Sequence, residues 1–399
     1  MDNNQNQAQY SYYQNLYNMF GGHNPLIDTK VKKLQRTGFI IGCGMICFTI
    51  MQYVFAFLLQ RFGLYSLYNS DPFYQLGISA IAPIFYVLLP FVLVYLLYTR
   101  EEKNSVDIYE LPKSKELFIF SVFTGLLICS FGDTATAYFS TFFNMMGVSF
   151  ERPDTLNANS PVSYALQIVA YAIIPPLVEE FAMRGVVMQP LRKYGDSFAI
   201  IVSSILFAAL HGNMVQIPFA FIAGLALGYF AIVTNSIWTS VAIHFLNNFT
   251  ATVISVHYDK NPNDNMLFYY AIEGAILIVG IFAFIMFIKN KPSKLSKDTS
   301  EIGGSLKYST LFCTPSIVVS LLISLFTSLS FTKIRSGGGT LLTIALVALV
   351  AFFLIKGSLN ARRDIRITRS AMYNVSIVLT VIASVFMIYF LMIMPLSNQ

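Results

Sequence analysis

The chain has 399 residues, of which 55% are hydrophobic and 12% are charged, and its mean hydropathy is +0.61. Such a composition leaves too little polar surface to cover a soluble globule of this length, so it predicts a protein that places apolar surface in lipid. The net charge is +6. Because no basic patch is interleaved with aromatic residues, we attribute this charge to membrane topology and expect no nucleic-acid partner.

The first 29 residues are rich in Asn, Gln and Tyr and lack the basic-then-apolar order of a signal peptide. Asp2 stands where a myristoylation signal needs a glycine. We therefore expect residues 1–36 to form a polar tail on the cytoplasmic side. The composition of this tail and the compact loops are typical of a bacterial chain.

Runs of 17 or more mainly apolar residues are long enough to cross the hydrocarbon core as helices. We predict an all-α fold, a polytopic bundle of about eleven transmembrane helices. The expected spans are 38–59, 76–98, 117–142, 163–189, 197–215, 218–234, 236–256, 266–288, 309–332, 340–356 and 372–394.

The basic residues predict the orientation of these spans. With a cytoplasmic N-terminus, the inside segments hold 20 of the 26 Lys and Arg residues. Such a bias is what the positive-inside rule describes, and it favours a multi-pass protein of the cell membrane whose inner face meets anionic lipid.

Three short polar motifs interrupt the apolar spans. Ionisable groups at membrane depth are costly, so a set of them indicates a functional site. The motifs are VEEFAMRG with Glu179, Glu180 and Arg184, FAALHG with His211, and SVAIHFLNN with His244 and Asn248.

Helical spacing separates the two adjacent glutamates. Successive residues of a helix point about 100° apart, whereas residues four apart are stacked neighbours. Glu180 and Arg184 are four apart, in the favourable order for an ion pair, so Glu179 is expected to face elsewhere. Pro175 and Pro176 remove backbone donors just upstream, which predicts a kink and a water path beside the carboxylates.

The remaining polar groups are expected at a similar depth. At 1.5 Å of rise per residue, Glu179 lies about 20 Å from Arg192 at the inner face, His211 about 22 Å from Asp196 and His244 about 14 Å from Asn235. A carboxylate, two imidazoles and the Asn248 amide gathered there can hold a water, take its proton and stabilise an oxyanion. The alternative is that single members only hydrogen bond between helices. We prefer that structural reading for Asp133 and Glu273.

The motifs EExxxR, FxxxH and HxxxN occur here in order, in EEFAMRG, FAALH and HFLNN, and the chain resembles the CPBP family of CAAX proteases and bacteriocin-processing enzymes, also called Abi. The likeness covers residues 163–256. It implies an intramembrane glutamate-dependent endopeptidase related to the Ras-converting CAAX endopeptidase. Glu179 then resembles the general base, aided by His211. His244 and Asn248 resemble the oxyanion-stabilising pair, and Glu180 with Arg184 the pair that fixes the helix.

Two points remain open beside this resemblance. Glu179, His211 and His244 can in principle form a zinc site with one carboxylate and two histidines, but the chain lacks an HExxH helix, so we expect no metal cofactor. A non-catalytic scaffold or immunity-type protein on the same fold is the alternative function, and a proton-coupled transporter is disfavoured because no inverted repeat is evident.

The resemblance also suggests the organisation of the chain. We expect N-terminal transmembrane helices over 37–160, a catalytic core over 161–290 and a transmembrane extension over 291–399 without counterpart in the family. The expected partners are the bilayer and a membrane-associated or secreted peptide or protein substrate. Prenylated substrates are not expected for a prokaryotic member.

Overall fold

The structure is a computed structural model, and it describes residues 25–99, 109–151, 158, 160–261, 266–298, 300 and 302–334. The predicted spans 340–356 and 372–394 lie outside the described residues. The all-α prediction is confirmed, with one small addition. Strands β1 (Val148–Phe150) and β2 (Thr332–Ile334) pair antiparallel, with Ser149 opposite Lys333.

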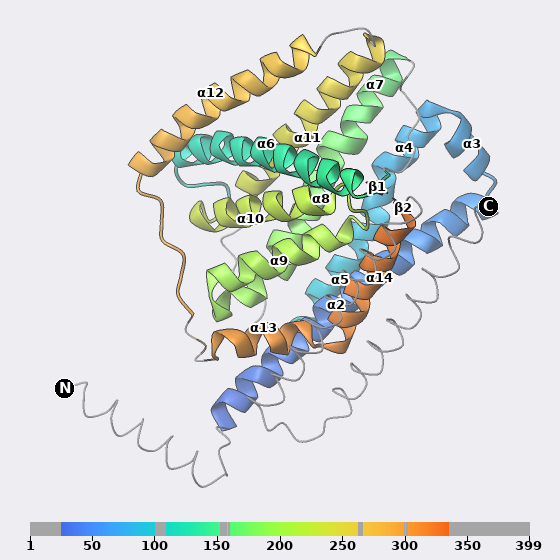
Figure 1. The fold of residues 1–399 in the computed structure, drawn as a ribbon. Helices are drawn as coiled ribbons and strands as arrows, with labels where there is room; N and C mark the ends of the chain where they lie inside the picture. Colours follow the sequence, from blue (N-terminus) through green and yellow to red (C-terminus); the bar gives the residue numbers. More distant parts are fainter. Residues whose placement is uncertain are drawn as a thin grey trace.

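Helices account for nearly all the remaining described elements (Figure 1). The α-helices are α2 (Pro25–Arg61), α3 (Tyr65–Ser70), α4 (Pro72–Pro83), α5 (Leu89–Leu97), α6 (Lys115–Met145), α7 (Pro161–Ile168), α8 (Ile174–Glu180), α9 (Asp196–Leu210), α10 (Ile217–Val233), α11 (Ile237–Lys260), α12 (Leu267–Lys289), α13 (Gly304–Phe312) and α14 (Pro315–Ser330). The π-helical segments are η1 (Ile84–Leu88), η3 (Val169–Ile173) and η4 (Phe181–Val187), and η5 (Gln189–Tyr194) is a 3₁₀ helix.

By length and composition, 5 helical runs of the described chain can cross a membrane, or 6 if the bent pair α13 and α14 is one span. That is fewer than the sequence predicts over the same residues. Helices α9 and α10 have 15 and 17 residues, and α11 carries the polar side chains of the third motif. Short and polar helices of this kind are better suited to the inside of a bundle than to contact with lipid.

The short helices do lie inside the bundle. Helix α10 packs against α9, α6 and α11, while α6 also packs against α12, whose outer face is exposed and apolar (Figure 1). Helix α2 packs against α14 and α5 on the opposite side. The centre of the core is the run Ala182–Met188, where no side chain is exposed.

Two glycines permit close approach of helices, one between α2 and α14 and one between α10 and α9. A Cβ atom on Gly42 of α2 would overlap the backbone of Ser316 and Ile317 at the start of α14. A Cβ atom on Gly224 of α10 would lie 3.0 Å from the Cβ atom of Ser204 on α9. Small residues at such crossings are how membrane helices approach without a hydrophobic driving force.

The helix from Pro161 to Tyr194 changes its hydrogen-bonding pattern on both sides of the two glutamates. A π-helical segment, η3, precedes α8, and a second, η4, follows Glu180. Pro175 and Pro176 supply no N–H group to the ladder where α8 begins. Such π segments occur frequently at functional sites. The extra residue per turn directs side chains away from their α-helical directions.

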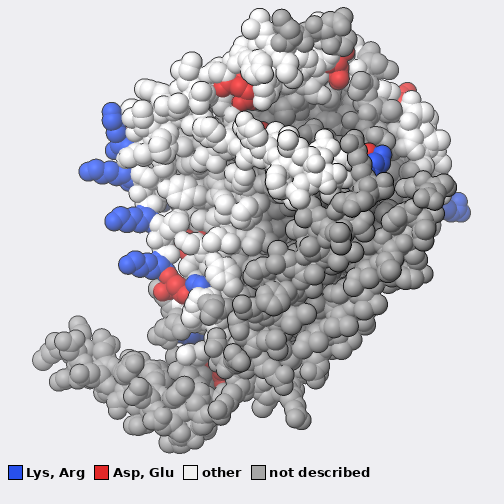
Figure 2. All heavy atoms as spheres, in the orientation of Figure 1, with Lys and Arg blue, Asp and Glu red and all other residues white. Residues whose placement is uncertain are grey.

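Charged side chains are unevenly distributed over the surface. Figure 2 shows Lys and Arg gathered along one edge, where α12 ends and α6 begins in Figure 1. Lys115 is the first residue of α6, Lys289 lies in the last turn of α12, and Arg192 and Lys193 lie in the last turn of η5. All four belong to segments that the sequence assigns to the cytoplasmic side.

Candidate active site

The two adjacent glutamates of α8 point to different surroundings. The side chain of Glu180 is 0% exposed and lies within the helix bundle, whereas that of Glu179 is 20% exposed and lines a cavity. This separation follows from the helical spacing of the two residues.

Glu180 holds two partners through one oxygen atom. Its Oε1 accepts a hydrogen bond from Arg184 Nη1 at 3.0 Å and another from His244 Nδ1 at 2.9 Å. The ion pair that the spacing predicts is therefore present, and it is completely buried. The bond to His244 joins α8 to α11, which the sequence pattern did not predict.

Arg184 is held from three sides. Its Nη2 donates to the carbonyl oxygen of Gly224 at 3.1 Å, and its guanidinium carbon lies 4.7 Å from the centre of the Phe207 ring. With Glu180, these contacts tie α8, α9 and α10 to one cation. A desolvated cation over an aromatic face adds attraction without requiring a second charge.

The buried pair is not fully satisfied. Among the described residues, Glu180 Oε2 and Arg184 Nε have no hydrogen-bonding partner. Buried ion pairs of this kind contribute little net stability, although removing one member is strongly destabilising. The effect of the Glu180–Arg184 pair is geometric, because the pair fixes the directions of α8 and of the His244 ring.

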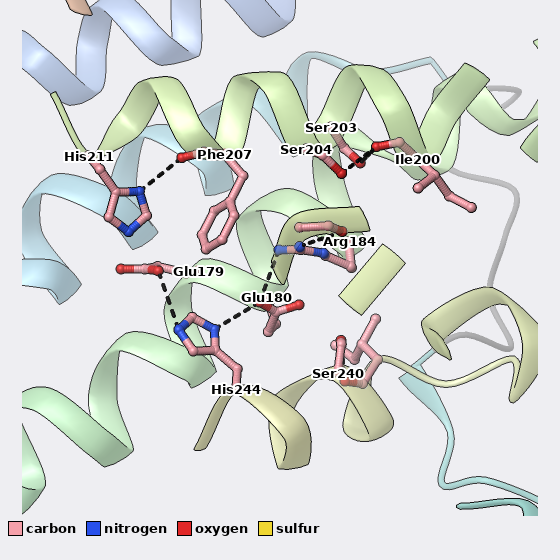
Figure 3. Close-up of polar contacts among 12 residues, drawn as sticks. Glu179, Glu180, Arg184, Ile200, Ser203, Ser204, Phe207, His211, Ser240 and His244 are labelled. Carbon is pink, nitrogen blue, oxygen red and sulfur yellow. Dashed lines mark hydrogen bonds and ion pairs between the residues drawn. The ribbon is translucent and has the colours of Figure 1, made fainter. Parts of the chain in front are cut away.

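His211 follows the last residue of α9, and its ring completes the end of that helix. Its Nδ1 lies 3.1 Å from the carbonyl oxygen of Phe207. A carbonyl can only accept, so Nδ1 carries the hydrogen and donates it. The other ring nitrogen, Nε2, is then left for the cavity, and Figure 3 shows this side of the ring directed toward Glu179.

His244 lies between the two glutamates (Figure 3). Its Nδ1 bonds to Glu180, while its Nε2 is 3.9 Å from Glu179 Oε2. The second distance is too long for a direct hydrogen bond and leaves room for a bridging atom. The same ring therefore contacts the buried ion pair and the cavity.

Asn248 lies one turn beyond His244 on the same face of α11. Its Nδ2 donates to the carbonyl oxygen of Tyr171 in η3 at 2.9 Å, and its Oδ1 accepts from Asn247 Nδ2 at 3.3 Å. A primary amide carries two hydrogens, so one bond to Tyr171 fixes the amide plane without using its whole donor capacity.

One cavity of about 850 Å³ brings these groups together. It lies among α2, α4, η3, α8, α9, α10 and α11, and its walls include Glu179, His211, His244 and Asn248. The volume is within the range of small-molecule and peptide sites, roughly 300–1,000 Å³. The aromatic part of the wall is formed by Phe55, Tyr65, Tyr68, Tyr86, Tyr171, Phe207 and Phe219.

The donor set does not form a metal centre as it stands. In the part of the chain that the structure describes, no group of three or more His, Cys, Asp and Glu side chains is arranged to hold a metal ion. Glu179, His211 and His244 share the cavity, and both Nδ1 atoms of the histidines are engaged with protein acceptors.

The two other acidic residues of the spans lie outside this cavity. Glu273 of α12 accepts a hydrogen bond from Ser130 of α6 through its Oε2 at 2.6 Å. This contact between two packed helices agrees with the structural reading of Glu273. Asp133 lies one turn further along α6.

Sequence reasoning missed the groups of this site that belong to the main chain. The carbonyl oxygens of Tyr171, Phe207 and Gly224 orient Asn248, His211 and Arg184. A carbonyl is present at every residue, so no sequence signal marks the ones that are used. Only the FxxxH spacing gave an indirect sign, since a side chain at the end of a helix reaches the carbonyl four residues back.

The profile of a known protein family matches part of the chain. Residues 161–250 match the family described as type II CAAX prenyl endopeptidase Rce1-like. This segment is similar to an Rce1-like domain. It contains all three polar motifs and indicates CAAX-type protease activity in a membrane protein, as the resemblance to CAAX proteases implied. No curated protein and no solved structure matches the chain.

Proposed function

We propose that this protein is an intramembrane endopeptidase in which Glu179 activates the attacking water. One observation carries the proposal. Glu179 faces a cavity together with the Nε2 sides of two histidines whose Nδ1 atoms are both engaged elsewhere. Such an arrangement presents one carboxylate and two oriented imidazoles to a single bound molecule.

The first step is activation of water. A water placed between Glu179 and His211 can donate one hydrogen to the carboxylate and the other to His211 Nε2. As Glu179 takes the proton, the water oxygen attacks the carbonyl carbon of a peptide bond in the cavity. A general base in this position typically contributes about 10²–10⁴ in rate.

The second step is stabilisation of the oxyanion. With Nδ1 donating to Glu180, His244 donates from Nε2 as well when its ring is doubly protonated. The remaining hydrogen of the Asn248 amide supplies a second donor. Collapse of the intermediate breaks the C–N bond, and the proton held by Glu179 passes to the departing amine.

The substrate is a peptide or protein segment that reaches the cavity from the membrane. The basic edge formed by the ends of α6, α12 and η5 is the cytoplasmic side, in accord with the positive-inside rule. We propose an unmodified membrane-associated or secreted peptide as the substrate, although the description of the matching family names a prenyl endopeptidase.

The experiment that tests this function compares the terminal peptides of membrane and secreted proteins from cells carrying wild-type protein or Glu179→Gln. We expect a defined set of new termini in the wild-type cells that is missing from the variant. Internally quenched peptides spanning such a site, with and without a farnesylated cysteine, then test the purified protein. Identical terminal peptides in both strains, with equal protein levels, would favour the non-catalytic scaffold.

A further inference from the structure

The chain beyond the Rce1-like domain contacts the helix that carries His211. Helix α14 lies against α2 and α9 (Figure 1). Ser324 of α14 donates a hydrogen bond from Oγ to the carbonyl oxygen of Ala209 at 2.6 Å. Ala209 is two residues before His211, in the last turn of α9.

This hydrogen bond supplies a partner for one of the last carbonyls of α9. The last four carbonyls of an α-helix have no partner within the helix. In α9, His211 Nδ1 takes the carbonyl of Phe207, the His211 backbone N–H takes that of Ala208 at 3.2 Å, and Ser324 takes that of Ala209. The contact from α14 therefore belongs to the same set of bonds that orients the His211 ring.

A second contact lies one turn further along α14. Gly212, directly after His211, has a φ angle of +58°, and a Cβ atom built on it would lie 3.1 Å from Thr327 Cγ2. The left-handed backbone at Gly212 ends the helix and turns the chain. Thr327 and Ser324 thus enclose the turn that carries His211.

Helix α14 is itself well anchored. Ser316 donates from Oγ to the carbonyl oxygen of Phe39 in α2 at 2.9 Å, where Gly42 permits the close crossing described above. At the other end of α9, Asp196 accepts from the backbone N–H of Ser296 at 2.7 Å. The segment after α12 is therefore bonded to α9 near both ends of α9.

We infer that α14 positions the catalytic histidine, with Ser324 as the positioning residue for His211. The inference rests on the proposed function for its effect on turnover, but the contact also has a consequence that needs no substrate. Without the Ser324 bond, the last turn of α9 loses the partner of one carbonyl. The bond from His211 Nδ1 to Phe207 then loses its fixed direction, and the ring samples both neutral tautomers.

The test compares Ser324→Ala with two matched variants. Ser324→Thr keeps the hydroxyl group. Ser320→Ala removes a hydroxyl one turn away on the same helix, where Oγ bonds to Ile317 of its own helix at 2.8 Å. The first readout is the nitrogen spectrum of the four histidines in ¹⁵N-histidine-labelled protein, with His211 assigned by loss of its signals in His211→Gln.

We expect His211 in wild type, Ser324→Thr and Ser320→Ala to show one tautomer, with the hydrogen on Nδ1, and in Ser324→Ala to show a mixture. On a peptide substrate, Ser324→Ala should lower kcat by about 2- to 10-fold, the equivalent of one neutral hydrogen bond, and leave KM unchanged. The melting temperature should match that of Ser320→Ala.

Two outcomes overturn the inference. One is a His211 spectrum in Ser324→Ala that is the same as in Ser320→Ala. The other is a loss of kcat that Ser324→Thr does not restore. If wild-type protein cleaves no peptide while Ser324→Ala still shifts the His211 spectrum, the proposed function fails but the positioning contact stands.

Discussion

The two faces of α8 place adjacent glutamates in opposite situations. On the inner face, Glu180 is buried and its Oε1 is shared by Arg184 and His244. On the outer face, Glu179 borders a cavity and has His244 Nε2 at 3.9 Å. Identical side chains therefore have different costs of removal. Loss of the Glu180 carboxylate leaves the buried Arg184 cation without its partner, whereas loss of the Glu179 carboxylate removes a reactive group from the cavity wall.

We expect the largest effects at His211 and His244, the two histidines that line the cavity. His211→Gln should lower turnover by about 10²–10⁴ and leave the melting temperature near that of wild type, because its ring contacts the cavity, the Phe207 ring and a carbonyl rather than the buried ion pair. His244→Gln should lower both, because its ring also bonds to the buried Glu180. Peptide cleavage and thermal melts in detergent measure the two effects.

His257→Gln is the matched control for both variants. This histidine lies near the end of α11, stacked on Phe268 at 3.9 Å between ring centres, outside the cavity walls. The His257→Gln substitution should leave turnover unchanged. A His244→Gln variant that is as stable as His211→Gln would show that the bond to Glu180 does not link the two faces.

The next effect concerns the inner face alone. Arg184→Ala should lower the free energy of unfolding by about 3–5 kcal/mol, since Glu180 would keep a buried charge without its cation. Denaturation in mixed micelles measures this loss, with Arg192→Ala as control, because the Arg192 side chain is partly exposed and its partner Asp196 keeps a hydrogen bond from the backbone N–H of Ser296. Equal losses in the two arginine variants would contradict a special role of the buried pair.

A smaller effect is expected at Phe207, which separates the cation from the histidines. Its ring centre lies 5.0 Å from that of His211 and 5.9 Å from that of His244, with Arg184 over its face. Phe207→Leu should cost about 1–3 kcal/mol through lost cation–π attraction and packing. Thermal melts check this value, and Phe207→Tyr, which keeps the ring, should lose less.

The smallest effect is expected outside the bundle, at Asp298. Burial alone would raise the pKa of this carboxyl, but hydrogen bonds from Lys307 and Ser300 outweigh it and hold the pKa below the ordinary value of 3.8. A lowered pKa in the folded state contributes stability at higher pH that is lost as the pH falls from about 4 through the folded-state pKa.

Comparison of wild type with Asp298→Asn isolates this contribution. The difference in melting temperature should be small at pH 6, because the Asp298 side chain is 28% exposed and the pair with Lys307 is screened. It should shrink further below pH 4. A difference that grows on acidification would show that the carboxyl is not the stabilising partner.

The sequence predicted the parts of the site that depend on spacing within one helix. Helical period alone placed Glu180 beside Arg184 and turned Glu179 away, and the similar depth of the three motifs, together with the family resemblance, predicted that they meet. The π-helical segments on both sides of α8 were not predicted, because their hydrogen bonds depend on packing against other helices. The bond between Glu180 and His244 has the same cause, since 64 residues separate its partners.

Hydropathy predicted the helices of the bundle, but it does not decide which of them cross the membrane. Hydropathy marked the regions of α9 and α10 as spans because buried and lipid-facing helices are both apolar. Helix α2 starts at Pro25, inside the segment expected as a polar tail, and the apolar residues Val31 and Leu34 of its first turns are buried. The role of Ser324 could not be foreseen, because a serine in an apolar helix is common.

The central claim is that the carboxylate in the cavity, and not the one in the buried pair, activates water. The most direct measurement is the turnover per folded molecule of purified Glu179→Gln and Glu180→Gln on the same peptide, with the folded fraction taken from thermal melts. The account predicts a folded, inactive Glu179→Gln protein, and a Glu180→Gln protein that melts earlier but cleaves the peptide as long as it is folded. A stable, inactive Glu180→Gln protein beside an active Glu179→Gln protein would contradict it.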